Sequence, residues 1–344
     1  MSIKKYTRYC ANFILRNNRK DKLRNLFNLR VVGLDMADLT SMNSILKLLT
    51  MDKLIQGTAA GGTIRVLATV TTEILRETTK RHQPSPTATA ALGRVMTGAL
   101  LLGATLKDFD RITIKIEADG PIGGIVAEAT PHGTVRGYVK NPNAEIPIRQ
   151  DGKFDVGGIV GGGTFYVIRE SGFDLGLHDK PYVGSVPIVS GEIAEDLAYY
   201  LAKSEQIPSA VMLGVLLQNT EPLITAAGGV LIQMLPGANE HIITMIEDTI
   251  RHAPHITSVI KDGATPEDLA RLALGVIDFE ILGEKEVAFR CNCSIEKAIS
   301  LVSSLGPDEV SSMLSEEKGA VMTCGFCNET YRLNEADLLA MLET

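Results

Sequence analysis

The sequence contains no tryptophan, and its aromatic residues make up only 5% of the chain. Proteins that bind single-stranded nucleic acid rely on aromatic side chains for base stacking. The scarcity of aromatic residues therefore argues against binding of single-stranded nucleic acid. Positive charge is scarce too, since 34 Lys and Arg stand against 41 Asp and Glu, a net charge of −7. Residues 1–50 hold ten of those basic residues and only three of the acidic ones. The remainder is therefore strongly acidic and repelled by phosphate backbones, and we expect no nucleic-acid partner.

Long hydrophobic runs are also missing. The closest is VMTGALLLGATL, residues 95–106, which follows Arg94 and falls short of the roughly 18 apolar residues that a membrane helix needs. Ser85 and Pro86 supply an N-cap and a first helical residue, so a helix over 85–107 is predicted. We interpret it as a buried core helix and expect no membrane partner.

No grouping of residues typical of catalysis is visible. The six histidines are scattered, and no Ser/His/Asp or Cys/His set emerges. The stretch GGIVGGGTF, 157–165, lacks the Lys and the Ser or Thr of a phosphate-binding loop, so turn glycines are the better interpretation. Glu192, Glu195 and Asp196 are interpreted as the solvated face of a helix rather than as paired catalytic carboxylates. We therefore do not expect an enzyme.

The first fifty residues differ from the rest of the chain. They are basic and contain neither a clear signal-peptide core nor a small-residue cleavage site. Serine is scarce, and Asp21 and Asp35 argue against a mitochondrial transit peptide. Met51 opens the stretch MDKLIQGTAAGGTIRV, which reads as a natural start. We interpret residues 1–50 as an extension from a misassigned start codon, and Cys10 within it as an incidental thiol.

An α+β domain with an antiparallel sheet is predicted over residues 51–237. Alternating apolar and polar residues over 111–141, broken by two turn signals, predict a three-stranded meander. A hairpin that turns at Gly228 and Gly229 is predicted over 222–237. Further strands are predicted over 61–70, 157–170 and 182–191.

Residues 238–290 change character and are predicted to form a helical linker. Asn239 caps a helix over 239–254 that carries an isoleucine-rich stripe, and Thr265 caps a second helix over 265–275. Two short helices are not stable alone in water, so their apolar faces must dock on another surface.

Cysteine is confined almost entirely to the end of the chain. Four of the five cysteines lie within residues 291–344, as a C-x-C pair and a C-x-x-C pair: Cys291, Cys293, Cys324 and Cys327. The C-x-C residues point to one face of an extended chain, and the C-x-x-C spacing is typical of a zinc knuckle. Gly325 is expected to let this turn fold tightly. No histidine follows His255, so we predict one zinc ion held by four cysteines.

Three roles for such a site remain open from spacing alone. A structural zinc would stabilise a tail that is short of core. A nucleic-acid-binding zinc ribbon is disfavoured, because residues 291–344 hold three basic and nine acidic residues. A redox sensor is the third role, since metal-bound thiolates stay nucleophilic and can be oxidised.

Several stretches resemble the redox-regulated bacterial heat-shock chaperone family of about 33 kDa. The resemblance covers residues 51–344 and rests on the cysteine pattern and on MDKLIQGTAAGGTIR, SPTATAALGR, GPIGGIVAEA, YVGSVPIVSGEIAEDLAYYL, GGVLIQMLPGA and FRCNCS. It implies an α+β client-binding core over 51–237, a metastable helical linker over 238–290 and a small zinc-binding redox-switch domain over 291–344.

The same resemblance implies a cytoplasmic holdase that is regulated by oxidation and needs no ATP. In the reduced, inactive state, four residues hold one zinc ion: Cys291, Cys293, Cys324 and Cys327. Oxidation pairs Cys291 with Cys293 and Cys324 with Cys327, releases the zinc and unfolds the linker. The active form is expected to be a homodimer that binds unfolded client proteins.

Two other functions compete with this one. A thiol–disulfide oxidoreductase would use Cys324 and Cys327, but such a motif normally accompanies a βαβ unit, whereas this pair lies in a predicted hairpin turn. A constitutive interaction module with a structural zinc would not change its behaviour on oxidation.

Overall fold

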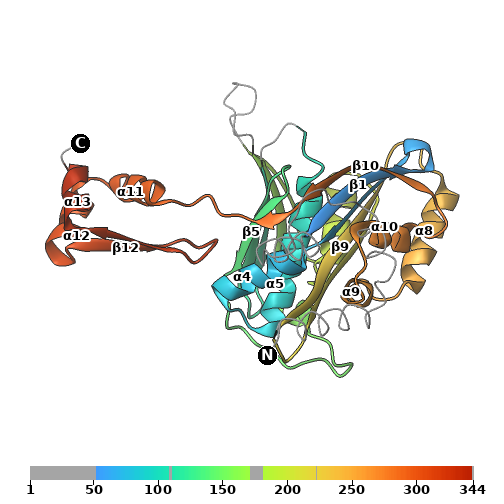
Figure 1. Ribbon diagram of the computed structural model, residues 1–344, viewed down its shortest axis with the longest axis horizontal. Helices are drawn as coiled ribbons and strands as arrows, with labels where there is room; N and C mark the ends of the chain where they lie inside the picture. The colour runs from blue at the N-terminus through green and yellow to red at the C-terminus, as the bar shows by residue number, and fades with distance from the viewer. Residues whose placement is uncertain (1–51, 108–110, 171–180, 222, 343–344) are drawn as a thin grey trace, which may run out of the picture. The chain divides into compact units, whose positions relative to one another are not determined.

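The structure is a computed structural model, and it describes residues 52–107, 111–170, 181–221 and 223–342 (Figure 1). The chain divides into two units, Met1–Thr50 and Met51–Thr344. Three predictions lie outside the described residues: the basic extension, the incidental thiol at Cys10 and the start at Met51.

Two sheets form the framework of the second unit. The strands of the first are β1 Lys53–Ala59, β2 Ile64–Val70, β8 Ser209–Leu217, β9 Ile224–Met234 and β10 Phe279–Glu286, in the order β10-β1-β2-β9-β8. The strands of the second are β3 Arg111–Ala118, β4 Gly124–Ala129, β5 Thr134–Val139, β6 Gly163–Glu170, β7 Tyr182–Pro187 and β11 Ala288–Phe289, in the order β11-β5-β4-β3-β6-β7. Within these sheets only β11 and β5 pair in parallel among the described strands. The predicted meander is β3, β4 and β5, and the α+β class is confirmed.

Helix α5, Pro86–Gly103, lies in the core and contacts strands of both sheets. Every residue of it except Pro86 and Arg94 is buried, and the Ser85 hydroxyl accepts a hydrogen bond from the N–H of Ala88. The predicted cap and the buried helix are both confirmed. Among the described residues, no helix is both long and apolar enough to cross a membrane. The other helices of this region are η1 Ala60–Gly62, α4 Thr72–His82, α6 Val156–Val160 and α7 Ala194–Lys203.

The hairpin predicted to turn at Gly228 and Gly229 is wrong, because β9 runs unbroken through both glycines. They pair with β2 on one side and β8 on the other. A Cβ at Gly229 would lie 2.6 Å from a methyl carbon of Leu213, and one at Gly228 would lie 2.6 Å from the carbonyl oxygen of Thr69. Both glycines therefore allow a close approach of neighbouring groups rather than a turn.

The prediction of a solvated carboxylate face is wrong for Asp196, which is only 1% exposed. Its carboxylate accepts hydrogen bonds from the backbone N–H groups of Val189, Ser190 and Ile193, at 2.8, 3.0 and 3.0 Å. Ile193 has a φ of 69°, a left-handed conformation that these bonds help to hold. Asp196 therefore fixes the chain as it enters α7.

The predicted linker contains three helices, α8 Glu240–His252, α9 Ile256–Lys261 and α10 Pro266–Leu274. The predicted caps of α8 and α10, Asn239 and Thr265, both accept backbone hydrogen bonds. The apolar residues of these helices, such as Ile246 and Leu269, share a buried cluster with β1, β2 and β9. Figure 1 shows the helices covering the face of the first sheet that lies away from α5. The prediction that the helices dock is confirmed, whereas α9 and strand β10 were not foreseen.

Residues 291–342 form a small C-terminal layer with helices and strands of its own. Its elements are α11 Ile295–Ser303, α12 Pro307–Glu316, the antiparallel pair β12 Gly319–Thr323 and β13 Thr330–Asn334, and α13 Glu335–Leu342. Its buried apolar cluster consists of five residues, Val302, Val310, Ala320, Leu333 and Leu338. So small a core gives little stability of its own.

Asp52 joins three segments of the fold. Its carboxylate accepts a hydrogen bond of 2.8 Å from the N–H of Ile74 in the first turn of α4. Its carbonyl oxygen accepts one of 3.0 Å from Val287, between β10 and β11. Asp52 is 3% exposed, and this burial raises the pKa of its carboxyl to about 7 although the N–H groups of α4 act in the opposite direction.

We predict that Asp52 makes the fold less stable as the pH rises through 7. A pKa raised above its unfolded value means that the folded state binds the proton more tightly, so the stabilisation is complete below the unfolded pKa of 3.8 and is lost through about pH 7. Asp52→Asn keeps an acceptor and cannot ionise. Its urea midpoint should therefore fall less than that of the unsubstituted chain between about pH 5 and about pH 8. Asp262→Asn, at an exposed aspartate, is the control, and equal falls in all three proteins would contradict the prediction.

We also predict that docking of the linker depends on Leu269. This residue is fully buried, so Leu269→Ala should lower the free energy of unfolding by about 2–5 kcal/mol and speed hydrogen exchange across 238–290. Leu282→Ala is the matched control, because Leu282 is 63% exposed on β10. Its effect should stay within about 0.5 kcal/mol. Urea denaturation and exchange followed by mass spectrometry test this, and similar losses in both variants would refute it.

Candidate metal centre

Four cysteine sulfurs from two separate segments meet at one point. Cys291 and Cys293 follow β11, whereas Cys324 and Cys327 lie in the turn between β12 and β13. All four Sγ atoms lie within 4.8 Å of one another. The Sγ atoms of Cys291 and Cys324 are 3.7 Å apart, and those of Cys293 and Cys327 are 3.3 Å apart.

This spacing fits a single tetrahedral metal ion. Four thiolates at about 2.3 Å from a zinc ion would place their sulfurs about 3.8 Å from each other. Soft thiolate ligands in this number suit zinc, and no histidine or carboxylate of the described residues joins the cluster. The four cysteines can therefore hold a metal ion.

The C-x-x-C turn is closed by the backbone. The N–H of Asn328 donates to the carbonyl of Cys324 at 2.8 Å, and the N–H of Cys324 donates to the carbonyl of Glu329 at 2.8 Å. Asn328 carries the positive φ of this turn, 60°, a conformation that asparagine tolerates. The expectation that Gly325 makes the turn possible is wrong, because its φ is not positive and a Cβ there would meet nothing within 4 Å.

Two side chains donate hydrogen bonds to the sulfurs of the C-x-C pair. Tyr331 Oη, from β13, donates to Cys293 Sγ at 3.1 Å. Arg136 Nη1, from β5 in the core, donates to Cys291 Sγ at 3.4 Å. Such donors stabilise a thiolate and orient it toward a metal ion.

The four thiols differ in how readily they ionise. Burial alone would raise the pKa of Cys291, but hydrogen bonds from Arg136 and from the neighbouring cysteines outweigh it and lower the pKa to about 7. Burial raises the pKa of Cys324 and, much more, that of Cys327, which is 3% exposed. The Tyr331 hydroxyl has a raised pKa because it donates to Cys293. Cys291 is therefore much more readily ionised than Cys327, and the thiolate is the form that binds metal and attacks oxidants.

A cavity of about 400 Å³ opens beside this cluster. Its walls include Cys291, Cys293 and Cys327 together with Arg81 of α4 and Phe289 of β11. Small molecules therefore have room to reach the neighbourhood of the sulfurs.

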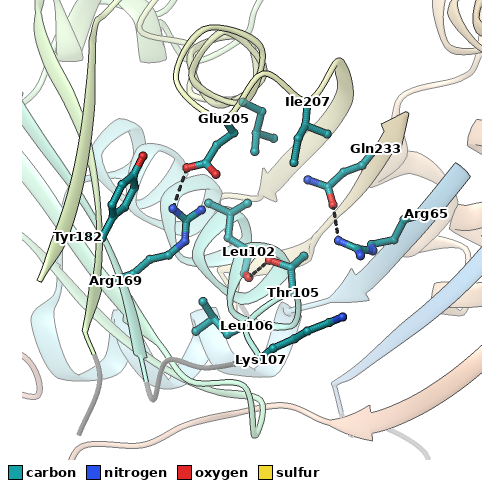
Figure 2. A pocket seen from close by; sticks show the side chains of 11 residues that line it. Arg65, Leu102, Thr105, Leu106, Lys107, Arg169, Tyr182, Glu205, Ile207 and Gln233 are labelled. Atoms are coloured by element: carbon teal, nitrogen blue, oxygen red, sulfur yellow. Dashed lines mark hydrogen bonds and ion pairs between the residues drawn. The ribbon is translucent and has the colours of Figure 1, made fainter. Parts of the chain in front are cut away.

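A second hollow of about 400 Å³ lies elsewhere in the core, and Figure 2 shows its lining. Arg169 forms an ion pair with Glu205 at 2.7 Å, and Arg65 donates to Gln233 at 3.1 Å. The charged and polar side chains of this hollow therefore bind one another. Among the residues that Figure 2 labels, no nucleophile is paired with a base.

The comparisons with known proteins agree with the geometry. A family model described as "Hsp33 protein" matches residues 52–334. The chain belongs to the Hsp33 family. A "33 kDa chaperonin" of Bacillus licheniformis is 45% identical over 292 residues, which cover 85% of this chain and 99% of that protein. The "33 kDa chaperonin" of Desulforamulus reducens is 44% identical over 292 residues, which cover 85% of this chain and 97% of that protein.

A solved structure of the family has the same fold. The crystal structure of the 33 kDa chaperonin (heat shock protein 33 homolog) of Thermotoga maritima matches with a TM-score of 0.77 at 36% identity. The match covers 85% of this chain and 98% of that one. The resemblance inferred from the cysteine pattern and sequence stretches is thus confirmed, and the relatives are chaperones by name.

The sequence identified the four cysteines but not the residues around them. Arg136, Tyr331 and Arg81 come from a strand, a hairpin and a helix that are distant in sequence from the C-x-C pair, and no spacing signals their approach. Binding of zinc by the four cysteines, and their disulfide pairing, stay predictions.

We predict that Tyr331 strengthens metal binding. Tyr331→Phe keeps the ring and removes the hydrogen bond to Cys293, so zinc affinity should fall by about tenfold or more, as when other partners of metal ligands are lost. Competition of the reduced protein with a chromogenic chelator measures this affinity. Tyr182→Phe removes a hydroxyl from the core hollow and should leave the affinity unchanged. An unchanged affinity in Tyr331→Phe would show that the bond does not support the metal.

Proposed function

We propose that this chain is a redox-regulated holdase that protects unfolding proteins from aggregation without ATP. Membership of a chaperone family supports the general class. The observation that carries the regulatory part is the meeting of four cysteine sulfurs, from two segments, within 4.8 Å. The resemblance to the family also supports a cytoplasmic location.

In the reduced state, four residues would hold one zinc ion and so link the two segments: Cys291, Cys293, Cys324 and Cys327. The ion supplies a structural cross-link there, and its binding free energy becomes folding free energy of the small C-terminal layer. That layer has only five buried apolar residues in its cluster, so its stability depends strongly on such a cross-link. The reduced protein is then a poor chaperone, because its apolar surfaces remain covered.

Oxidation breaks the cross-link. Two thiolates, Cys291 and Cys293, lose two electrons and form one disulfide, while one hydrogen peroxide takes up these electrons and two protons to give two water molecules. Cys324 and Cys327 react in the same way with a second peroxide. Pairing within each segment leaves no bond between the two segments, whereas pairing across them would preserve the link. After both reactions the four cysteines no longer offer thiolates, so they would release a bound zinc ion.

Loss of the cross-link then destabilises the linker. Strand β11 ends two residues before Cys291, and β10 pairs with β1. Helices α8, α9 and α10 cover apolar residues of the first sheet, among them Ile55, Val66 and Val230. If these helices unfold, both their apolar faces and the sheet become available to unfolded clients, and the oxidised protein acts as a homodimer.

The test is light scattering from a chemically unfolded client diluted into zinc-loaded reduced protein or into peroxide-oxidised protein. We expect that only the oxidised form suppresses scattering, because only it exposes the covered surface. Cys10→Ser should suppress scattering as the unsubstituted chain does, and only after oxidation. Cys327→Ser should suppress scattering to the same extent with and without peroxide. Equal suppression by both forms would support a constitutive module with a structural metal. Sustained turnover of a disulfide substrate would support an oxidoreductase.

A further inference from the structure

Side chains of the core hold the loop that carries Cys324 and Cys327. The residue before Cys327 is Phe326, and the guanidinium of Arg136 lies 4.0 Å from the centre of its ring. Tyr138 meets the same ring edge-on, with 5.2 Å between centroids and an interplanar angle of 84°. Arg136 and Tyr138 point to the same side of β5, because they are two residues apart in a strand. Phe326 is thus bound by a cation and an aromatic ring of the core.

Helix α4 supplies the rest of the contact. A ring nitrogen of His82, Nε2, lies 3.0 Å from the carbonyl oxygen of Phe326. The side-chain amide of Asn328 donates through Nδ2 to the carbonyl of Arg81 at 3.0 Å. Arg81 Nη1 donates to the carbonyl of Cys327 at 3.5 Å. The last turn of α4 therefore binds the backbone of the C-x-x-C turn.

Arg136, which faces the Phe326 ring, is itself held by a neighbouring strand of the core. Arg136 forms an ion pair of 2.8 Å with Glu128, its partner in the register between β4 and β5. The side chains of Arg136 and Glu128 are only 17% and 16% exposed, and this pair fixes the guanidinium that faces Phe326 and Cys291. Arg136 thus touches both cysteine segments, one through a sulfur and the other through the ring.

We propose that this cradle, formed by Arg136, Tyr138 and His82 around Phe326, is a latch that couples the metal centre to the core. The position of the Phe326 ring follows from the turn between Cys324 and Cys327, so the ring fits the cradle only while that turn keeps its shape. The coupling is reciprocal: the docked ring stabilises the metal-bound turn, and the metal-bound turn stabilises docking. The regulatory meaning of the latch rests on the proposed function, because in a redox switch it sets how easily the cysteine loops leave the core.

The test compares two variants that damage the latch from opposite sides. Phe326→Ala removes the ring. Tyr138→Leu removes the aromatic ring of the cradle and leaves the hydrogen bond from Arg136 to Cys291 in place. Val321→Ala is the control, because Val321 is 60% exposed on β12 of the same layer. Zinc-loaded, reduced full chain is mixed with excess chromogenic chelator, and the rate of metal transfer is measured.

We expect Phe326→Ala, which loses a cation–π and an aromatic contact, to release zinc about tenfold faster than Val321→Ala. Tyr138→Leu loses the aromatic contact alone and should release zinc about threefold faster. Backbone amides at the end of α4 and around Phe289 should also exchange faster in both variants. Release at the control rate by both would overturn the latch. Faster release by Phe326→Ala alone would also overturn it, since the effect would then arise within the cysteine loop.

These readouts are independent of client binding and of oxidation. If the unsubstituted chain fails to suppress scattering after oxidation while both latch variants lose zinc faster, the latch stands and the chaperone proposal falls. If the chain binds no zinc, the amide exchange alone decides: faster exchange in both variants supports the latch, and unchanged exchange overturns it.

Discussion

The proximity of four thiol sulfurs is the constraint on which the end of this chain depends. Residues 291–342 form three helices and one strand pair, but their apolar cluster has only five buried members. A layer of that size gains too little from apolar burial to offset the entropy of ordering its chain. A metal ion that bound only the folded arrangement would supply the missing stability, and oxidation of the sulfurs would remove it.

In the proposed function, the loss of metal acts on a linker whose folded state depends on its contacts with the core. Its strands β10 and β11 are both joined to the core sheets, and Asp52 binds the chain between them through its carbonyl oxygen. The helices that precede these strands are short and amphipathic, so they derive their stability from docking rather than from their own propensity. A structural change at Cys291 would therefore begin two residues from β11. The linker helices that precede β10 and β11 stay folded only while they are docked on the core.

Local signals in the sequence predicted the local features of this fold. Capping residues such as Ser85 and Thr265 were identified because a cap depends on groups within one helical turn, and the cysteine pairs because metal ligands need particular spacings. Gly228 and Gly229 were misread as a turn, since the close neighbours that require glycine there lie on other strands and on the linker. Asp196 was misread for the same reason: its partners include backbone groups that precede the helix, which polarity and periodicity do not reveal.

The candidate metal centre is therefore connected to the core both along the chain and through side-chain contacts, and two of these connections differ physically. One is the chain itself, through β11 and Arg290, the single residue between this strand and Cys291. The other is the cradle that binds Phe326 across a gap of more than 180 residues in sequence, and no local pattern announces it. A connection through the chain alone would let the cysteine loops move while the core stayed unchanged. Two connections make detachment more cooperative, because the loops leave the core only when the turn that positions Phe326 has also changed.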